Sequence, residues 1–458
     1  MKEHVKSLTL TATLFESPFP EGSEKSQPHL STQDSIIISG DDDIWNRPRK
    51  ALLYLRPFRS PRRRPEDIIH DLDRFVRSLD RVAHLTIDSH FNHTLIPNST
   101  CSLRFLGAGW HAFGQTLRSL TLKGNLSLLE SVLEDSIYLA SLERLSVDLA
   151  RNKHGVEVGA AYFALTQFIK RHSTALSTLE IVSADLADSN WFSQGLERLP
   201  RLQRLKIQQP PSEDHGQRSA MRQFLLRHID TIVDLEWGYT DTHTPYKDDR
   251  GASEESGSPP PLDITFPHIQ RFAVCGSCPG SVYLQSAMTF IERHQKTLTS
   301  LSFISWSLGF KDFIRLAEKA ASPVMEELDC DVFILTSSVF ATLKVHFPSL
   351  QALGLSYGML GRTLRETPPS RDPNIPITSV DELDSLDISG GLRLKVFGKD
   401  MDAVMLADWP IERLNLRESR RLVNKADYRI ECVGKVIVAR LPKVGFVNGM
   451  YRENFVAS

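Results

Sequence analysis

Leu117-Arg118-Ser119-Leu120-Thr121-Leu122 carries the spacing that decides the fold: apolar, two residues, apolar, one residue, apolar. In an extended segment Leu120 and Leu122 point to one side and Thr121 points to the other. A strand this short cannot bury its apolar side alone, but stacked copies cover one another and share one core. The spacing therefore predicts a repeat protein if it recurs.

The same spacing recurs from residue 5 to residue 446. The middle apolar residues of its copies are Leu8, Leu85, Leu120, Leu145, Leu179, Leu205, Leu235, Phe272, Leu301, Leu328, Leu353, Leu386, Leu414 and Val444. From Leu85 onward the copies follow one another at a mean interval of about 30 residues, the upper end of the leucine-rich-repeat range, where the chain returns through a helix. The sequence therefore predicts an α/β leucine-rich-repeat solenoid, with a curved parallel sheet inside and helices outside.

Helical periodicity fills the intervals between these copies. The segment from Pro65 to Leu79 has one apolar face and is predicted to be an outer helix. A second phrase precedes three strands, as Phe168–His172, Phe224–His228 and Phe290–His294, and His346 has the same spacing to the strand after it. Equivalent residues of a solenoid lie in a row, so these histidines are predicted to meet the last carbonyls of their helices rather than to form a catalytic or metal site.

Breaks in the repeat spacing suggest how the chain is organised. Residues 1–64 are expected to be an irregular N-terminal segment with one repeat strand around Leu8 and a disordered stretch. Residues 65–458 are expected to form the solenoid. Two polar, proline-rich stretches, 241–263 and 365–378, are predicted to be loop insertions, since a longer loop costs little once its ends are held.

Composition limits the class of protein. The 458 residues include 54 Lys and Arg against 56 Asp and Glu, and this balance argues against a chain built mainly to bind nucleic acid. No apolar run has the length of a membrane span, and the N-terminus lacks a signal-peptide pattern. Five scattered cysteines fit reduced thiols better than disulfides. An intracellular protein, in the cytoplasm or the nucleus, is expected.

The sequence contains no recognisable catalytic or phosphate-binding motif. Cys275 and Cys278 have the spacing of half a zinc site, but there is no second pair, so a tight turn is the expected structure. His90 and His93 lie in a polar stretch without an evident third ligand. We therefore predict no catalytic residues, no metal and no cofactor.

The strand residues that alternate with the core leucines are predicted to face the concave side, where repeat proteins usually bind. The charge along this face is expected to be basic near Arg204 and acidic further along the chain. A long polar face of varying sign suits a protein partner better than a small molecule. The predicted partner-binding residues are Arg204, Lys206, Glu236, Asp329, Asp331, Asp387 and Asn415.

The leucine spacing, together with the repeated Phe-[Ile/Leu]-x-Arg-His phrase, resembles the leucine-rich-repeat region of fungal F-box proteins and, more broadly, ribonuclease-inhibitor-like repeats. The resemblance extends from about Pro65 to Phe446. It implies a solenoid that recruits a substrate, while a separate F-box docks on a ubiquitin-ligase adaptor. Pro65–Ile69 looks like an F-box opening, but the strand phrase at Val82 leaves no room for the rest. The F-box is thus expected to be absent by nature or to precede the given sequence.

These observations predict a non-enzymatic scaffold that binds a protein partner, with ubiquitin-ligase components among the candidates. Two alternatives remain open. One is an enzyme whose site lies on a loop such as Asp241–Asp263. The other is an RNA-associated protein that uses the basic run Arg59–Arg64, which is otherwise expected to be a solvated loop.

Overall fold

The fold is described from a computed structural model. The structure describes residues 7–11, 36–39, 51–53, 74, 81–88, 109–124, 133, 138–149, 158–183, 195–209, 215–240, 262–276, 281–360, 401, 406, 408–418, 430–448 and 450–453. The chain divides into two compact units. Unit 1 comprises Met1–Ile232 and Thr240–Ile264, and unit 2 comprises Val233–Tyr239 and Thr265–Ser458.

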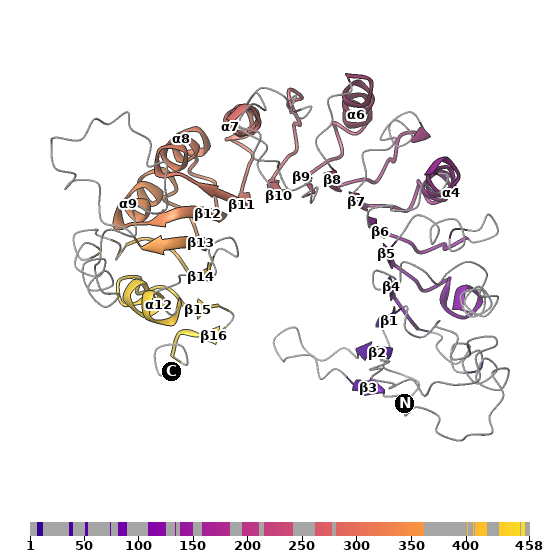
Figure 1. Ribbon diagram of the computed structural model, residues 1–458, viewed down its shortest axis with the longest axis horizontal. Helices are drawn as coiled ribbons and strands as arrows, with labels where there is room; N and C mark the ends of the chain where they lie inside the picture. Colours follow the sequence, from indigo (N-terminus) through magenta and orange to yellow (C-terminus); the bar gives the residue numbers. More distant parts are fainter. Residues whose placement is uncertain are drawn as a thin grey trace, which may run out of the picture. The chain divides into compact units, whose positions relative to one another are not determined.

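Unit 1 contains a sheet in which β1 and β4 to β8 run parallel in adjacent positions, while β2 and β3 continue it antiparallel beyond β1. The strands are β1 (Ser7–Thr11), β2 (Ile36–Ser39), β3 (Ala51–Leu53), β4 (His84–Asp88), β5 (Ser119–Gly124), β6 (Arg144–Leu149), β7 (Thr178–Ser183) and β8 (Arg204–Gln209). Two helices, α4 (Val158–Arg171) and α6 (His215–Arg227), lie on one side of these strands (Figure 1).

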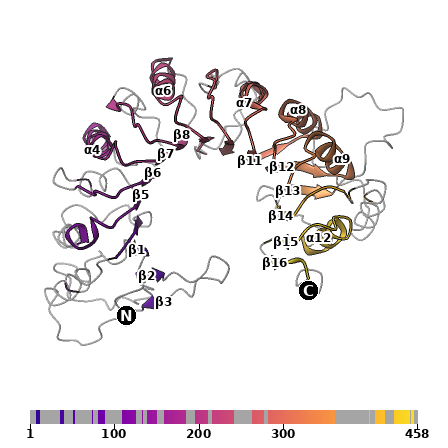
Figure 2. The same cartoon turned by 180° about the vertical axis from the view of Figure 1, so that it is seen from behind.

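Unit 2 repeats the arrangement with β9 to β15 parallel and β16 antiparallel at the end. The strands are β9 (Asp234–Tyr239), β10 (Arg271–Gly276), β11 (Ser300–Leu308), β12 (Glu327–Leu335), β13 (Ala352–Leu360), β14 (Arg413–Glu418), β15 (Phe446–Val447) and β16 (Met450–Tyr451). Its described helices are α7 (Ser281–His294), α8 (Phe310–Ala320), α9 (Ser337–His346) and α12 (Ile430–Val438), again on one side of the strands (Figure 2).

The apolar residues of the repeated spacing form the core as continuous rungs. In unit 1, neighbouring strands pair Leu85 with Leu120, Leu120 with Leu145, Leu145 with Leu179, and Leu179 with Leu205. All five side chains are buried. In unit 2 the equivalent rung joins Leu235, Phe272, Leu301, Leu328, Leu353, Leu414 and Val447. The predicted α/β leucine-rich-repeat solenoid is confirmed.

Three predicted histidines join one repeat to the next. His228 follows α6, and its Nδ1–H donates to the Phe224 carbonyl at 2.7 Å. Its Nε2 accepts a hydrogen bond from the backbone N–H of Leu199, in the preceding repeat, at 2.8 Å. His172 and His294 make the same two contacts with their neighbours. Each imidazole thus caps its own helix and also satisfies a buried amide of the adjacent repeat.

The fourth histidine differs from this pattern, which corrects the prediction that all four are equivalent. The side chain of His346 is half-exposed, and its backbone carbonyl, not its imidazole, accepts the hydrogen bond from the Ser322 N–H at 3.2 Å. The residue four positions earlier is Thr342, whereas the other three histidines pack on a phenylalanine at that position. The buried ring that holds the imidazole is therefore missing.

Two predicted rungs are wrong. The spacing at Leu441–Phe446 places Val444 in the rung, but Leu414 pairs with Val447, three residues later. The spacing at Leu383–Ile388 predicts a strand between those at Leu353 and Leu414, but β13 pairs directly with β14. A strand has only two edges, and β12 occupies the other edge of β13, so no position remains for a further strand between β13 and β14. Residues 383–388 themselves lie outside the described residues.

Several other predictions lie wholly or mainly outside the described residues. They include the helix from Pro65 to Leu79, of which only Arg74 is described, the basic run Arg59–Arg64 and the insertion 365–378. The insertion 241–263 is described only at its last two residues. The division at residue 64 stays a prediction.

Candidate functional site

The candidate site is the polar face of the strands, opposite the buried leucines. In β5 and β6 every second residue is buried, so the first, third and fifth residues of each strand are the outward positions. In-register pairing arranges these positions in rows that cross the sheet. The helices cannot contribute to this face, because they pack on the apolar side.

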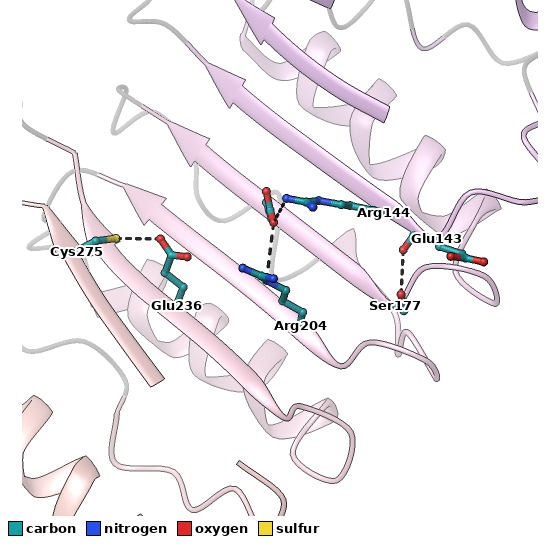
Figure 3. Close-up of polar contacts among 7 residues, drawn as sticks. Glu143, Arg144, Ser177, Arg204, Glu236 and Cys275 are labelled. Carbon is teal, nitrogen blue, oxygen red and sulfur yellow. Dashed lines mark hydrogen bonds and ion pairs between the residues drawn. The ribbon is translucent and has the colours of Figure 1, made fainter. Parts of the chain in front are cut away.

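One cluster of polar contacts in unit 1 centres on Glu180, the third residue of β7. Its side chain is only 9% exposed, and its Oε1 accepts a hydrogen bond from Arg144 Nη2 at 2.7 Å. Arg204 Nε lies 3.9 Å from the same oxygen. Figure 3 shows the Arg144 and Arg204 side chains reaching toward one another from β6 and β8. One buried carboxylate therefore holds two arginines from the strands on either side.

The outward positions of β4 to β8 carry four cationic side chains, at Lys123, Arg144, Arg204 and Lys206. They carry three anionic side chains, at Asp88, Asp148 and Glu180. The excess of one positive charge arises around Glu180, where two arginines share a single carboxylate.

Unit 2 has ion pairs of a different kind, which cross over β13. Arg413 Nη2 donates to Glu327 Oε1 at 2.8 Å, and Arg417 Nη2 donates to Asp329 Oδ2 at 2.8 Å. The Asp329 carboxylate lies over Gly354, where an added Cβ would come within 2.6 Å of Oδ1. A glycine in β13 is what allows this carboxylate to reach an arginine of β14.

The outward positions of β9 to β14 carry three arginines, at Arg271, Arg413 and Arg417, against five carboxylates. The carboxylates are at Asp234, Glu236, Asp329, Glu327 and Asp331. The strand face of unit 2 therefore has an excess of two negative charges.

The predicted partner-binding residues fall on both units. Arg204 and Lys206 lie on β8 in unit 1, whereas Glu236, Asp329, Asp331 and Asn415 lie in unit 2. Glu236 accepts a hydrogen bond from the Cys275 thiol at 3.4 Å, and Asn415 is exposed. Asp387 lies outside the described residues.

Asp331 corrects the expectation of an exposed position, because it is only 4% exposed. The residues after Cys330 do not alternate as the predicted strand does, and Asp331 and Val332 are both buried. Arg144 and Glu180 were missed by the prediction, although the alternation places both at outward positions.

Buried titratable groups elsewhere have structural explanations. Burial lowers the pKa of His172, His228 and His294, although the hydrogen bond to a backbone carbonyl acts in the opposite direction. The neutral Nδ1–H form is the one whose Nε2 can accept the neighbouring amide. Burial raises the pKa of the Cys330 thiol, and Asp329 and Asp331 beside it raise it further, so this thiol is not a nucleophile.

Among the described residues, no group of His, Cys, Asp and Glu side chains has the arrangement of a metal site. The described helices likewise include none with the length and apolar character of a membrane span. Cys275 is buried within β10 and not in a turn after the strand, while Cys278 and the rest of the predicted turn lie outside the described residues.

No family model matches the chain, and no curated protein matches it in sequence. A chain from the crystal structure of the Rad7 and Elc1 complex in yeast has a similar fold. The two share 16% sequence identity with a TM-score of 0.38, and the match covers 69% of this chain and 79% of that chain. At this TM-score the similarity carries no argument about activity or partners.

Proposed function

We propose that this chain is a non-enzymatic interaction scaffold that holds a protein partner against the polar face of its strands. The observation that carries the proposal is the set of arginine–carboxylate contacts that fix charged side chains on that face in both units. Side chains held in place lose less conformational entropy on binding, so such a face favours an extended protein contact.

The resemblance of the repeats to those of fungal F-box proteins supports a finer form of the proposal. In this form the solenoid is the substrate-holding part of a ubiquitin-ligase receptor, without a recognisable F-box in the given sequence, and it acts inside the cell. The chain then binds its partner and the ligase components separately, and only the partner binds to the strand face.

The proposal is tested by comparing a change on the strand face with the same kind of change on a helix. Ser146→Arg and Ser302→Arg each place a long side chain at the third residue of a strand, which is an outward position, in β6 and β11. Phe163→Arg is the control. It places the same side chain on α4, at a position where the native phenylalanine is already 64% exposed.

Tagged full-length protein would be cross-linked in cells, and the proteins bound to each variant would be quantified by mass spectrometry. We expect at least one strand-face variant to lose a partner that Phe163→Arg retains. If both strand-face variants retain every partner, or if only Phe163→Arg loses one, the scaffold does not bind through its strands.

A further inference from the structure

We propose that the cluster of Arg144, Glu180 and Arg204 on unit 1 binds carboxylate side chains of an extended, Asp- and Glu-rich segment of a protein partner. This inference rests on the proposed function, since it names the chemistry that the strand face of unit 1 recognises. It depends on the geometry of three neighbouring strands.

The cluster is built by strand register. The pairing of β6 with β7 and of β7 with β8 aligns Arg144, Thr178 and Arg204 in one row, with Glu180 two residues further along β7. Both guanidinium groups bend toward Glu180 Oε1, Arg144 at 2.7 Å and Arg204 at 3.9 Å (Figure 3). Two strand spacings of about 4.8 Å separate the arginine backbones, but the shared carboxylate draws their charged ends together.

The exposure of the three side chains is unequal, and this decides which charge a partner meets. The Glu180 side chain is 9% exposed, whereas those of Arg144 and Arg204 are 47% and 44% exposed. The arginines cover the carboxylate, so the accessible surface of the cluster is cationic. Each guanidinium has five N–H donors in a planar fork, and one carboxylate cannot occupy two such forks.

The buried carboxylate also orients the arginines before a partner arrives, Arg144 through a hydrogen bond and Arg204 through the attraction of an ion pair. An arginine that is free in solvent must lose side-chain entropy to hold a carboxylate, whereas one already oriented loses less. Lys206 pairs with Glu180 in the strand register and adds a further cation, and the hydroxyls of Thr86, Thr121 and Ser146 continue the same row. These groups suit an acidic segment laid across the strands.

The length of that segment follows from the sheet. The four strand spacings from β4 to β8 amount to about 19 Å, which roughly six residues of extended peptide span. An eight-residue probe therefore covers the face with a residue to spare at each end.

The strand face of unit 2 lacks this excess of cations. There, Arg413 and Arg417 each contact a carboxylate of their own, and the face as a whole is negative. Arg413 provides a matched control, because it occupies the first outward position of its strand, as Arg144 and Arg204 do, and is also held by a glutamate. Replacing any of the three by glutamine changes the net charge equally.

The test measures fluorescence anisotropy of a labelled octapeptide of alternating Asp and Ser with the full-length chain, at low and at physiological salt. The same peptide with Asn in place of Asp is the neutral control. We expect the acidic peptide to bind, Arg144→Gln and Arg204→Gln each to weaken it about tenfold, and Arg413→Gln to change it by less than about twofold. Equal binding of the Asn peptide, or equal loss in all three variants, would overturn the proposal.

Two further outcomes are decisive. A single-stranded RNA octamer that binds more tightly than the acidic peptide, with the same dependence on Arg144 and Arg204, would identify phosphates as the ligand and overturn the proposal. A cellular partner that is released by Ser146→Arg or Ser302→Arg but retained by Arg144→Gln and Arg204→Gln would leave the scaffold function standing and refute this site.

Discussion

The histidine contacts between repeats lead to a quantitative prediction for His228→Phe. His228 is 1% exposed, and its imidazole makes hydrogen bonds of 2.7 Å to the Phe224 carbonyl and 2.8 Å to the Leu199 N–H. Phenylalanine keeps the aromatic packing but can neither donate nor accept. Leaving a buried amide and a buried carbonyl without partners costs about 1–3 kcal/mol each, so the unfolding free energy of unit 1 should fall by about 2–6 kcal/mol.

The fold itself indicates that phenylalanine fits at this position. Phe113 stands four residues before Leu117, as His228 does before Ile232, and it is 2% exposed. Its carbonyl accepts the Leu117 N–H at 2.9 Å, as the His228 carbonyl accepts that of Ile232 at 3.1 Å. The cost should therefore come from the lost hydrogen bonds and not from a steric clash.

The assay combines urea unfolding with amide hydrogen exchange, because exchange reports on the Leu199 N–H directly. We expect this amide to exchange at least about 30-fold faster in His228→Phe, the factor that corresponds to 2 kcal/mol. His346→Phe is the control, since its half-exposed imidazole makes no equivalent contact with the preceding repeat, and it should change stability by less than about 0.5 kcal/mol. Equal destabilisation by both variants, or unchanged exchange at Leu199, would refute the role assigned to the imidazole.

Three other predictions concern pH, strand packing and the core. Burial lowers the pKa of the three repeat-joining histidines, so below pH 6.5 the unfolded chain binds protons first, and stability should fall by up to about 1.4 kcal/mol per pH unit for each. Urea midpoints between pH 7.5 and 5.5 would measure this, and His228→Phe should reduce the slope by about one third. Gly354→Ala should displace the Asp329 carboxylate and lower the free energy of unfolding by about 1 kcal/mol or less, measured by thermal unfolding. Gly445→Ala should cost less, because the atom nearest to its added Cβ would be 4.0 Å away. The reverse order of the two costs would contradict the packing around Gly354. Leu205→Ala should lower the unfolding free energy by about 2–5 kcal/mol and exposed Gln203→Ala by less than about 0.5 kcal/mol, and similar values for the two would place Leu205 outside the core.

The rungs of the core could be predicted from the sequence because strand geometry fixes the alternation of side chains. Leu120 and Leu145 occupy equivalent places in the repeated spacing, and the sheet pairs them directly. The spacing alone could not exclude the false copy at Leu383–Ile388. Three apolar residues at the right intervals also occur by chance, and only the direct pairing of β13 with β14 shows that no strand lies between them.

The candidate site was harder to predict, since it depends on contacts between residues far apart in the sequence. The alternation assigns Arg144 and Glu180 to outward positions, but it cannot tell that Glu180 is buried beneath two arginines. Similarly, Asp329 reaches Arg417 only because Gly354 lies between their strands. The residue types along one strand do not show whether the neighbouring strand leaves space for a given side chain.

The in-register stack of strands in unit 1 is the claim on which the strand face and its binding chemistry depend. It is tested most directly by the distance between spin labels at Thr86 in β4 and Lys206 in β8, which lie in the same row four strands apart. Pulsed electron–electron double resonance on the full-length chain should give about 19 Å between the labelled positions, from four spacings of about 4.8 Å. A single distribution centred well beyond about 30 Å would mean that these strands are not consecutive rungs of one sheet.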